Sequence, residues 1–116
     1  MKAFIFAGLL LSASGPAAMA AGAFDGQWAV ELLTIRGDCE RSLTWEVGVR
    51  SSRISETGAF GQAVGAVDSR GQVRLQVYNA SDRMSASGKL TRTSGAGAWT
   101  SPTRACSGRW RAARRS

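Results

Sequence analysis

Histidine is absent from this chain of 116 residues. Its absence excludes a Ser-His-Asp triad, a Cys-His pair and any metal site that needs an imidazole ligand. Lysine occurs only at Lys2 and Lys89, and the two cysteines lie too far apart for a Cys-x-x-Cys motif. The sequence therefore predicts no metal site and no cofactor.

Long apolar runs are also missing. The longest, residues 3–11, has nine residues, about half of the roughly 20 that a membrane-spanning helix needs. It follows the positive Lys2 and precedes Pro16 and Ala18-Met19-Ala20, whose small residues fit a signal-peptidase site. We predict a signal peptide over residues 1–20, a single mature domain over residues 21–116, no membrane span, and a periplasmic or secreted location.

Two cysteines, Cys39 and Cys106, allow only one intramolecular pairing in an oxidising compartment. The bond would close a loop of 67 residues (106 − 39). A domain this small gains much of its stability from such a bond. We therefore predict a structural disulfide.

Apolar residues of the mature chain recur at every second position, which is typical of half-buried antiparallel strands. Turn signals rich in Gly, Ser, Asn and Asp separate these runs at intervals of roughly 8–15 residues. No window shows the apolar spacing of a helix. The pattern predicts seven or eight short strands, with inward positions at Trp28, Val30, Leu32, Leu43, Trp45, Val47, Val49, Val73, Leu75, Val77, Met84, Ala86, Gly88, Leu90, Cys106, Gly108, Trp110 and Ala112.

A sheet of this length must close or fold on itself, because exposed strand edges promote aggregation. The predicted disulfide brings an early strand to the last one. An up-and-down barrel is therefore expected, with a β-sandwich as the alternative. Its core would hold Trp28, Trp45 and Trp110, and small residues would fill the interior around them: Ala63, Ala66, Ala86 and Ala98. A packed lumen and a ligand cavity both remain open.

The segment Phe24-Asp25-Gly26-Gln27-Trp28 carries a Gly-x-Trp at the opening of the first strand. This segment resembles the calycins, the barrel family of lipocalins and avidins. The resemblance implies that Trp28 closes one end of the barrel and that a basic residue of the last strand, Arg109 or Arg111 beside Trp110, packs across it by cation–π contact. Trp28 and Trp110 are accordingly the predicted barrel-closing residues, and the resemblance implies a carrier of a small apolar ligand.

Four motifs are spread over most of the mature chain. They are Phe-Asp-Gly-x-Trp at 24–28, Gly-Asp-Cys at 37–39, Gly-Ala-Gly-Ala-Trp at 95–99 and Cys-Ser-Gly-Arg-Trp at 106–110. Together they resemble small exported proteins of alphaproteobacteria. This resemblance implies an exported all-β domain with the same disulfide, and it transfers no catalytic or binding residue. Bacterial small-barrel protease inhibitors share the Gly-x-Trp strand and a single disulfide, which makes protease inhibition a further alternative.

Charge is distributed unevenly along the mature chain. Residues 21–82 carry six basic and eight acidic residues, whereas residues 83–116 carry eight basic and no acidic residues. Arginine favours bidentate contact with phosphate or carboxylate. The predicted anion-binding residues are Arg104, Arg109, Arg111, Arg114 and Arg115. Partners accessible to an exported protein are lipopolysaccharide, acidic polysaccharide and anionic lipid, whereas export argues against nucleic acid. A solvated tail that keeps the protein soluble is the alternative.

Carboxylates fall at turns or at outward strand positions, where two of them do not face each other across a cleft as in a glycosidase. A Ser-Lys dyad at Lys89 stays open, but no catalytic residue is predicted. We expect a monomeric, non-enzymatic binding or envelope-associated protein, whose contact surface is the Arg-rich C-terminal strand and tail. The carrier and the protease inhibitor are the alternatives.

Overall fold

A computed structural model gives the fold and describes residues 22–58 and 61–116. Most of these residues lie in eight antiparallel strands, and one turn of 3-10 helix, η1 (Pro102–Arg104), precedes the last strand. The strands are β2 (Gly26–Arg36), β3 (Ser42–Arg50), β4 (Arg53–Gly58), β5 (Gly61–Val67), β6 (Gln72–Tyr78), β7 (Arg83–Leu90), β8 (Ser94–Ser101) and β9 (Cys106–Arg114). The predicted signal peptide lies outside the described residues.

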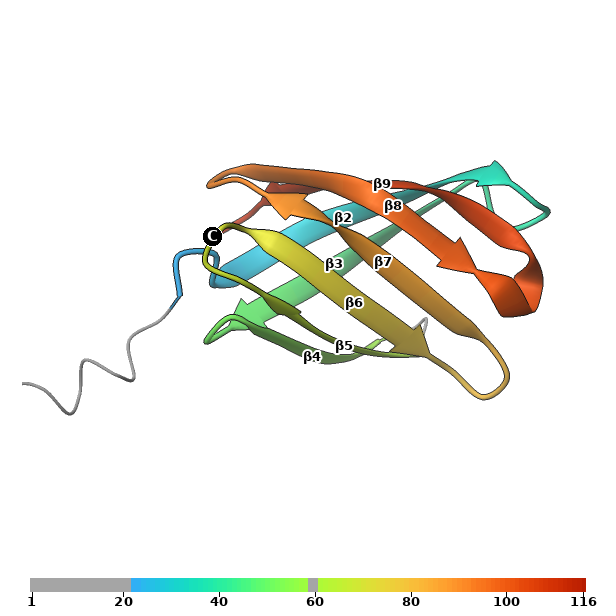
Figure 1. The fold of residues 1–116 in the computed structure, drawn as a ribbon, viewed down its shortest axis with the longest axis horizontal. Helices are drawn as coiled ribbons and strands as arrows, with labels where there is room; N and C mark the ends of the chain where they lie inside the picture. The colour runs from blue at the N-terminus through green and yellow to red at the C-terminus, as the bar shows by residue number, and fades with distance from the viewer. Residues whose placement is uncertain (1–21, 59–60) are drawn as a thin grey trace, which may run out of the picture.

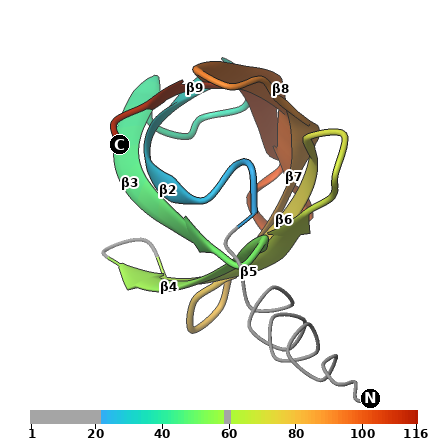
Figure 2. The ribbon, with the colours of Figure 1, turned by 90° about the vertical axis from the view of Figure 1, so that its left-hand side faces the viewer.

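Each strand pairs with the next one along the chain, and β9 pairs with β2, so that the sheet closes into an up-and-down barrel. Figure 1 shows the barrel from the side, and Figure 2 shows it from one end, as a ring of strands around a central lumen. The predicted all-β barrel is confirmed, together with the meeting of its first and last strands. Closure rules out the β-sandwich alternative.

Side chains alternate between lumen and solvent along the strands, as the two-residue apolar period predicts. In β7, for example, exposed and less exposed residues alternate from Arg83 to Leu90. All four tryptophans are buried, so the core includes Trp99 as well as the three predicted tryptophans. The placement of Ala66 and Ala98 in the interior was wrong: both are exposed, because each sits one position before an inward residue of its strand.

One end of the barrel is closed by the segment that leads into β2, which crosses the opening in Figure 2. Trp28 is only 2% exposed, and its indole Nε1 donates a hydrogen bond to the carbonyl of Phe24 over 3.0 Å. The guanidinium of Arg114 lies 5.4 Å from the centre of the Trp28 ring and donates to the carbonyls of Ala23 and Asp25. This end is therefore capped by packing and by hydrogen bonds to backbone carbonyls.

The Cys39–Cys106 disulfide is formed and joins the loop after β2 to the start of β9 at the opposite end of the barrel. The predicted pairing is confirmed. Among the described residues, no helix is long and apolar enough to cross a membrane.

Candidate functional site

Among the described residues, the loop 37–41, the turn 79–82 and η1 surround the end of the barrel opposite Trp28, and we call this end the mouth. A cavity of about 250 Å³ opens there. Its walls are mainly apolar, and the apolar side chains that line it are Leu32, Leu43, Trp45, Val77, Met84 and Trp99, together with the disulfide at Cys39.

A smaller cavity of about 50 Å³ lies deeper in the lumen and is lined by apolar residues alone. Leu32, Trp45 and Met84 line both cavities. These three side chains therefore lie between the cavity at the mouth and the inner cavity, whose wall at the closed end includes Trp28. The lumen is filled over most of its length and stays hollow near the mouth.

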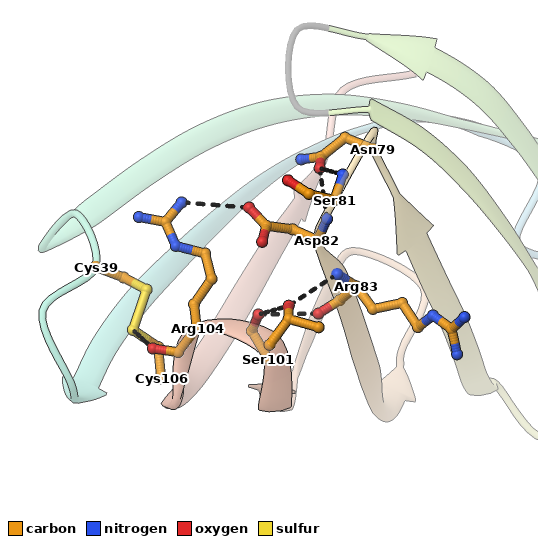
Figure 3. A network of polar contacts seen from close by, with 9 residues as sticks. Cys39, Asn79, Ser81, Asp82, Arg83, Ser101, Arg104 and Cys106 are labelled. Atoms are coloured by element: carbon orange, nitrogen blue, oxygen red, sulfur yellow. Dashed lines mark hydrogen bonds and ion pairs between the residues drawn. A yellow bond between two sulfur atoms is a disulfide. The ribbon is translucent and has the colours of Figure 1, made fainter.

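The rim of the mouth is polar and is tied together by a network of contacts (Figure 3). In the turn 79–82, the side-chain oxygen of Asn79 accepts a hydrogen bond from the backbone N–H of Asp82 over 2.9 Å. The hydroxyl of Ser101 donates to the carbonyl of Arg83 over 2.9 Å, which holds η1 against β7. The disulfide fixes the loop after β2 on the other side. Three separate loops are thus held in a fixed rim.

Both signs of charge occur at this rim. Arg104 Nη1 lies 3.7 Å from Asp82 Oδ2, and both side chains are substantially exposed, so this ion pair contributes little to stability. Glu40 also lines the cavity. The mouth therefore offers an apolar interior to a ligand, and donors and acceptors at its entrance.

The five arginines predicted to bind anions do not form one surface. Arg104 lies at the mouth, whereas Arg114 lies at the closed end and stacks on Trp28. The side chains of Arg111 and Arg115 lie 2.8 Å and 3.7 Å from Glu31 and Glu46. Of the five, only Arg109 has no ion pair or hydrogen bond from its side chain within the described residues. Anion binding at these positions remains a prediction.

The barrel-closing role predicted for the tryptophans is divided. Trp28 caps the closed end, whereas Trp110 lines the inner cavity, where its indole donates to the carbonyl of Ser87 over 3.0 Å. The cation–π partner of Trp28 is Arg114, and the prediction of Arg109 or Arg111 was wrong because both are exposed on the outer face of β9. Alternation could have identified Arg114, since it shares the inward face with Trp110.

Sequence reasoning missed the polar residues of the rim. The turn signals rich in Gly, Ser, Asn and Asp predict turns but assign no function to Asn79, Asp82 or Ser101. Their shared location depends on which loops meet at one end of the barrel, which residue types alone do not show. In the described ranges 22–58 and 61–116, no three His, Cys, Asp or Glu side chains are placed to hold a metal ion.

No protein-family model, curated protein or solved structure gives a significant match to this chain. The resemblances to calycins, to small exported proteins and to protease inhibitors therefore remain predictions.

Proposed function

We propose that this protein is exported to the periplasm or the medium and there binds a small apolar molecule in the mouth of its barrel, without catalysing a reaction. The observation that supports this proposal is the mainly apolar cavity of about 250 Å³ at one end of the barrel, with a smaller apolar cavity deeper in the lumen. The disulfide is in keeping with an oxidising compartment outside the cytoplasm.

The size of the cavity limits the ligand. An enclosed apolar cavity of about 150 Å³ can hold benzene, and sites for drug-sized ligands begin at about 300 Å³. The 250 Å³ at the mouth therefore suit a single substituted ring or a chain of about eight carbons. The inner cavity would admit the end of such a chain past Met84.

The rim determines which part of the ligand faces water. An apolar chain would lie between Trp45 and Trp99, and a polar end group would remain among Asn79, Asp82 and Arg104. Since both signs of charge are present there, the rim suits an alcohol as well as a carboxylate. We expect 1-octanol and octanoate to bind with dissociation constants on the order of 10–100 μM, given the usual binding energy per ligand atom.

The test is isothermal titration calorimetry of the mature protein, residues 21–116, with these two probes. In the first variant, Leu43→Trp, the indole ring of the new tryptophan fills the cavity at the mouth. In the control, Ile35→Trp, the same ring is placed at a position that is 62% exposed on the outer wall. Leucine and isoleucine are isomers, so the two variants gain the same volume.

We expect Leu43→Trp to weaken binding of both probes at least tenfold and Ile35→Trp to leave it unchanged, with both variants folded by circular dichroism. Absence of binding to the unmodified protein would refute the proposal, as would equal affinity in the two variants. Preservation of the fold in Leu43→Trp is checked independently by its thermal midpoint. If that variant does not fold, the smaller Met84→Phe change tests the same cavity.

A further inference from the structure

Three arginines lie in one row across the outer wall of the barrel. Strand pairing connects Arg53 to Ala66, Ala66 to Arg74, Arg74 to Ser87, Ser87 to Ala98, and Ala98 to Arg109. We call this row of six residues the belt. One small residue separates Arg53 from Arg74, two separate Arg74 from Arg109, and all six members are exposed. We propose that the belt binds an acidic polysaccharide, with the arginines pairing with its carboxylates.

The arginines of the belt are available to a ligand. Within the described residues, none of the side chains of Arg53, Arg74 and Arg109 forms an ion pair or a hydrogen bond. This distinguishes them from Arg104, Arg111 and Arg115, which pair with carboxylates of the chain itself. A free guanidinium presents its planar fork of donors, which matches a carboxylate in a bidentate arrangement.

A second row lies beside the belt, two residues away from it on each strand, and every side chain in it except that of Val64 is an uncharged hydrogen-bonding group. Its pairings run from Ser55 through Val64 on β5 to Gln76, Ser85, Thr100 and Ser107. Hydroxyl and amide groups of this kind can donate to and accept from the hydroxyls of a sugar. Charged and neutral partners thus run in parallel, as a chain of acidic sugars requires.

The surface between the two rows is hollowed. One shallow depression extends from Arg53 and Arg74 to Thr100, and a second continues from Thr100 past Arg109 to Arg36. Because Ala66, Ser87 and Ala98 are small, a bound chain can approach the sheet between the arginines. The two depressions share Ala98 and Thr100, so they adjoin each other along the wall, and together they give a path for a bound chain.

The curvature of the barrel favours a flexible chain over a flat partner. The belt extends over six of the eight strands, from β4 to β9, and five strand spacings amount to about 24 Å along the wall. A flat membrane touches a cylinder along a narrow strip and cannot reach Arg53 and Arg109 together. A chain of sugars can follow the wall between them.

The outward side chains of the two rows also argue against single-stranded nucleic acid, which binds by stacking its bases on exposed aromatic rings. Neither row contains an aromatic residue. All four tryptophans have their rings in the core, and the exposed Tyr78 beside the second row is a single ring, whose hydroxyl donates a hydrogen bond to Gln76. The chemistry that the belt recognises is carboxylate and hydroxyl, without bases.

The proposal can be tested by binding of a fluorescently labelled alginate oligosaccharide, a chain of uronate sugars, measured by anisotropy at several salt concentrations. The belt variant is Arg53→Ser, Arg74→Ser, Arg109→Ser. The control variant is Arg41→Ser, Arg70→Ser, Arg92→Ser, which removes the same charge from turns outside the belt. Thermal midpoints verify that both variants are folded.

We expect the belt variant to bind about tenfold or more weakly, because each exposed ion pair contributes roughly a 1.5- to 5-fold effect. The control should stay within about twofold of the unmodified protein, whose affinity should fall with salt because the pairs are exposed.

Equal loss in both variants would mean that only net charge matters and would overturn the proposal. Absence of alginate binding at low salt, or tighter binding to single-stranded DNA or anionic vesicles, would also overturn it. Octanol binding should persist in the belt variant, so this test is independent of the one at the mouth.

Discussion

At the scale of single residues, strain is concentrated in the turn between β3 and β4. Ser51 and Ser52 have φ angles of 50° and 65°, a region that residues other than glycine rarely occupy. Their backbone N–H groups donate to the two carboxylate oxygens of Asp25 over 2.6 Å and 2.9 Å. Desolvation raises the pKa of Asp25, but these hydrogen bonds, with a further one from Gly22 and the charge of Arg114, lower it on balance. Asp25 thus holds the turn in its strained form.

Replacing Ser52 with glycine should stabilise the protein, because glycine adopts a positive φ without steric cost. We expect the free energy of unfolding to rise by about 1 kcal/mol and the thermal midpoint by about 4–8 °C. The control is Ser55→Gly, the same change at an exposed position within β4, which should lower stability. Calorimetric midpoints of the two variants give the comparison. A lower midpoint for Ser52→Gly than for the unmodified protein would contradict the assigned strain.

The same turn shows how far the residue scale is predictable. Ser51 and Ser52 are of a residue type that favours turns, and Asp25 belongs to the segment that opens the first predicted strand. Their contact was not predicted, since Asp25 and Ser51 are 26 residues apart in the chain. It depends on which loops share an end of the barrel. Local signals predict local structure, whereas this contact depends on barrel closure.

At the scale of the elements, glycines in β7 and β8 make room for a tryptophan. A Cβ atom at Gly97 would lie 2.6 Å from Trp110 Nε1 and 2.0 Å from the carbonyl oxygen of Ser87. A Cβ atom at Gly88 would lie 2.6 Å from the same ring. The indole of Trp110 therefore packs closely against the backbone of two paired strands. A side chain at either position would also meet the backbone of the neighbouring strand, so these glycines leave space both for the ring and for close strand pairing.

Gly97→Ala should accordingly destabilise the barrel. One of the clashing atoms belongs to the backbone and cannot move aside cheaply, so we expect a loss of about 3 kcal/mol, the upper end of the usual cost of overpacking. The control is Gly48→Ala, whose Cβ would meet only the ends of the Glu56 and Gln27 side chains. Urea unfolding curves of both variants would reveal the difference. Equal stability of the two variants would show that Trp110 repacks freely.

At the scale of the whole molecule, the two ends of the barrel differ in how they are held. The closed end is held by Trp28, Arg114 and Asp25, whereas the mouth is held by the disulfide and the polar rim around the cavity.

Alternation and the cysteine pair predicted the all-β barrel and the meeting of its first and last strands. The cavity could not be predicted, because its volume is the small difference between the space inside the ring of strands and the side chains that fill it. The belt was missed as well, because its arginines come from three segments that only the strand register brings into line.

The disulfide should supply a large share of the stability of the whole barrel. It closes a loop of 67 residues, and restricting the unfolded chain to this extent is worth about 4 kcal/mol. Small domains have only about 5–15 kcal/mol in total. The double variant Cys39→Ser, Cys106→Ser should therefore lose about 4 kcal/mol in urea unfolding. We expect dithiothreitol to produce the same loss in the unmodified protein and none in the variant.

If the variant kept its full stability, the strand pairing of β2 with β9 would be sufficient to close the barrel. Since Cys39 also lines the cavity, octanol titration of a variant that stays folded would then show whether the bond serves mainly to fix the mouth.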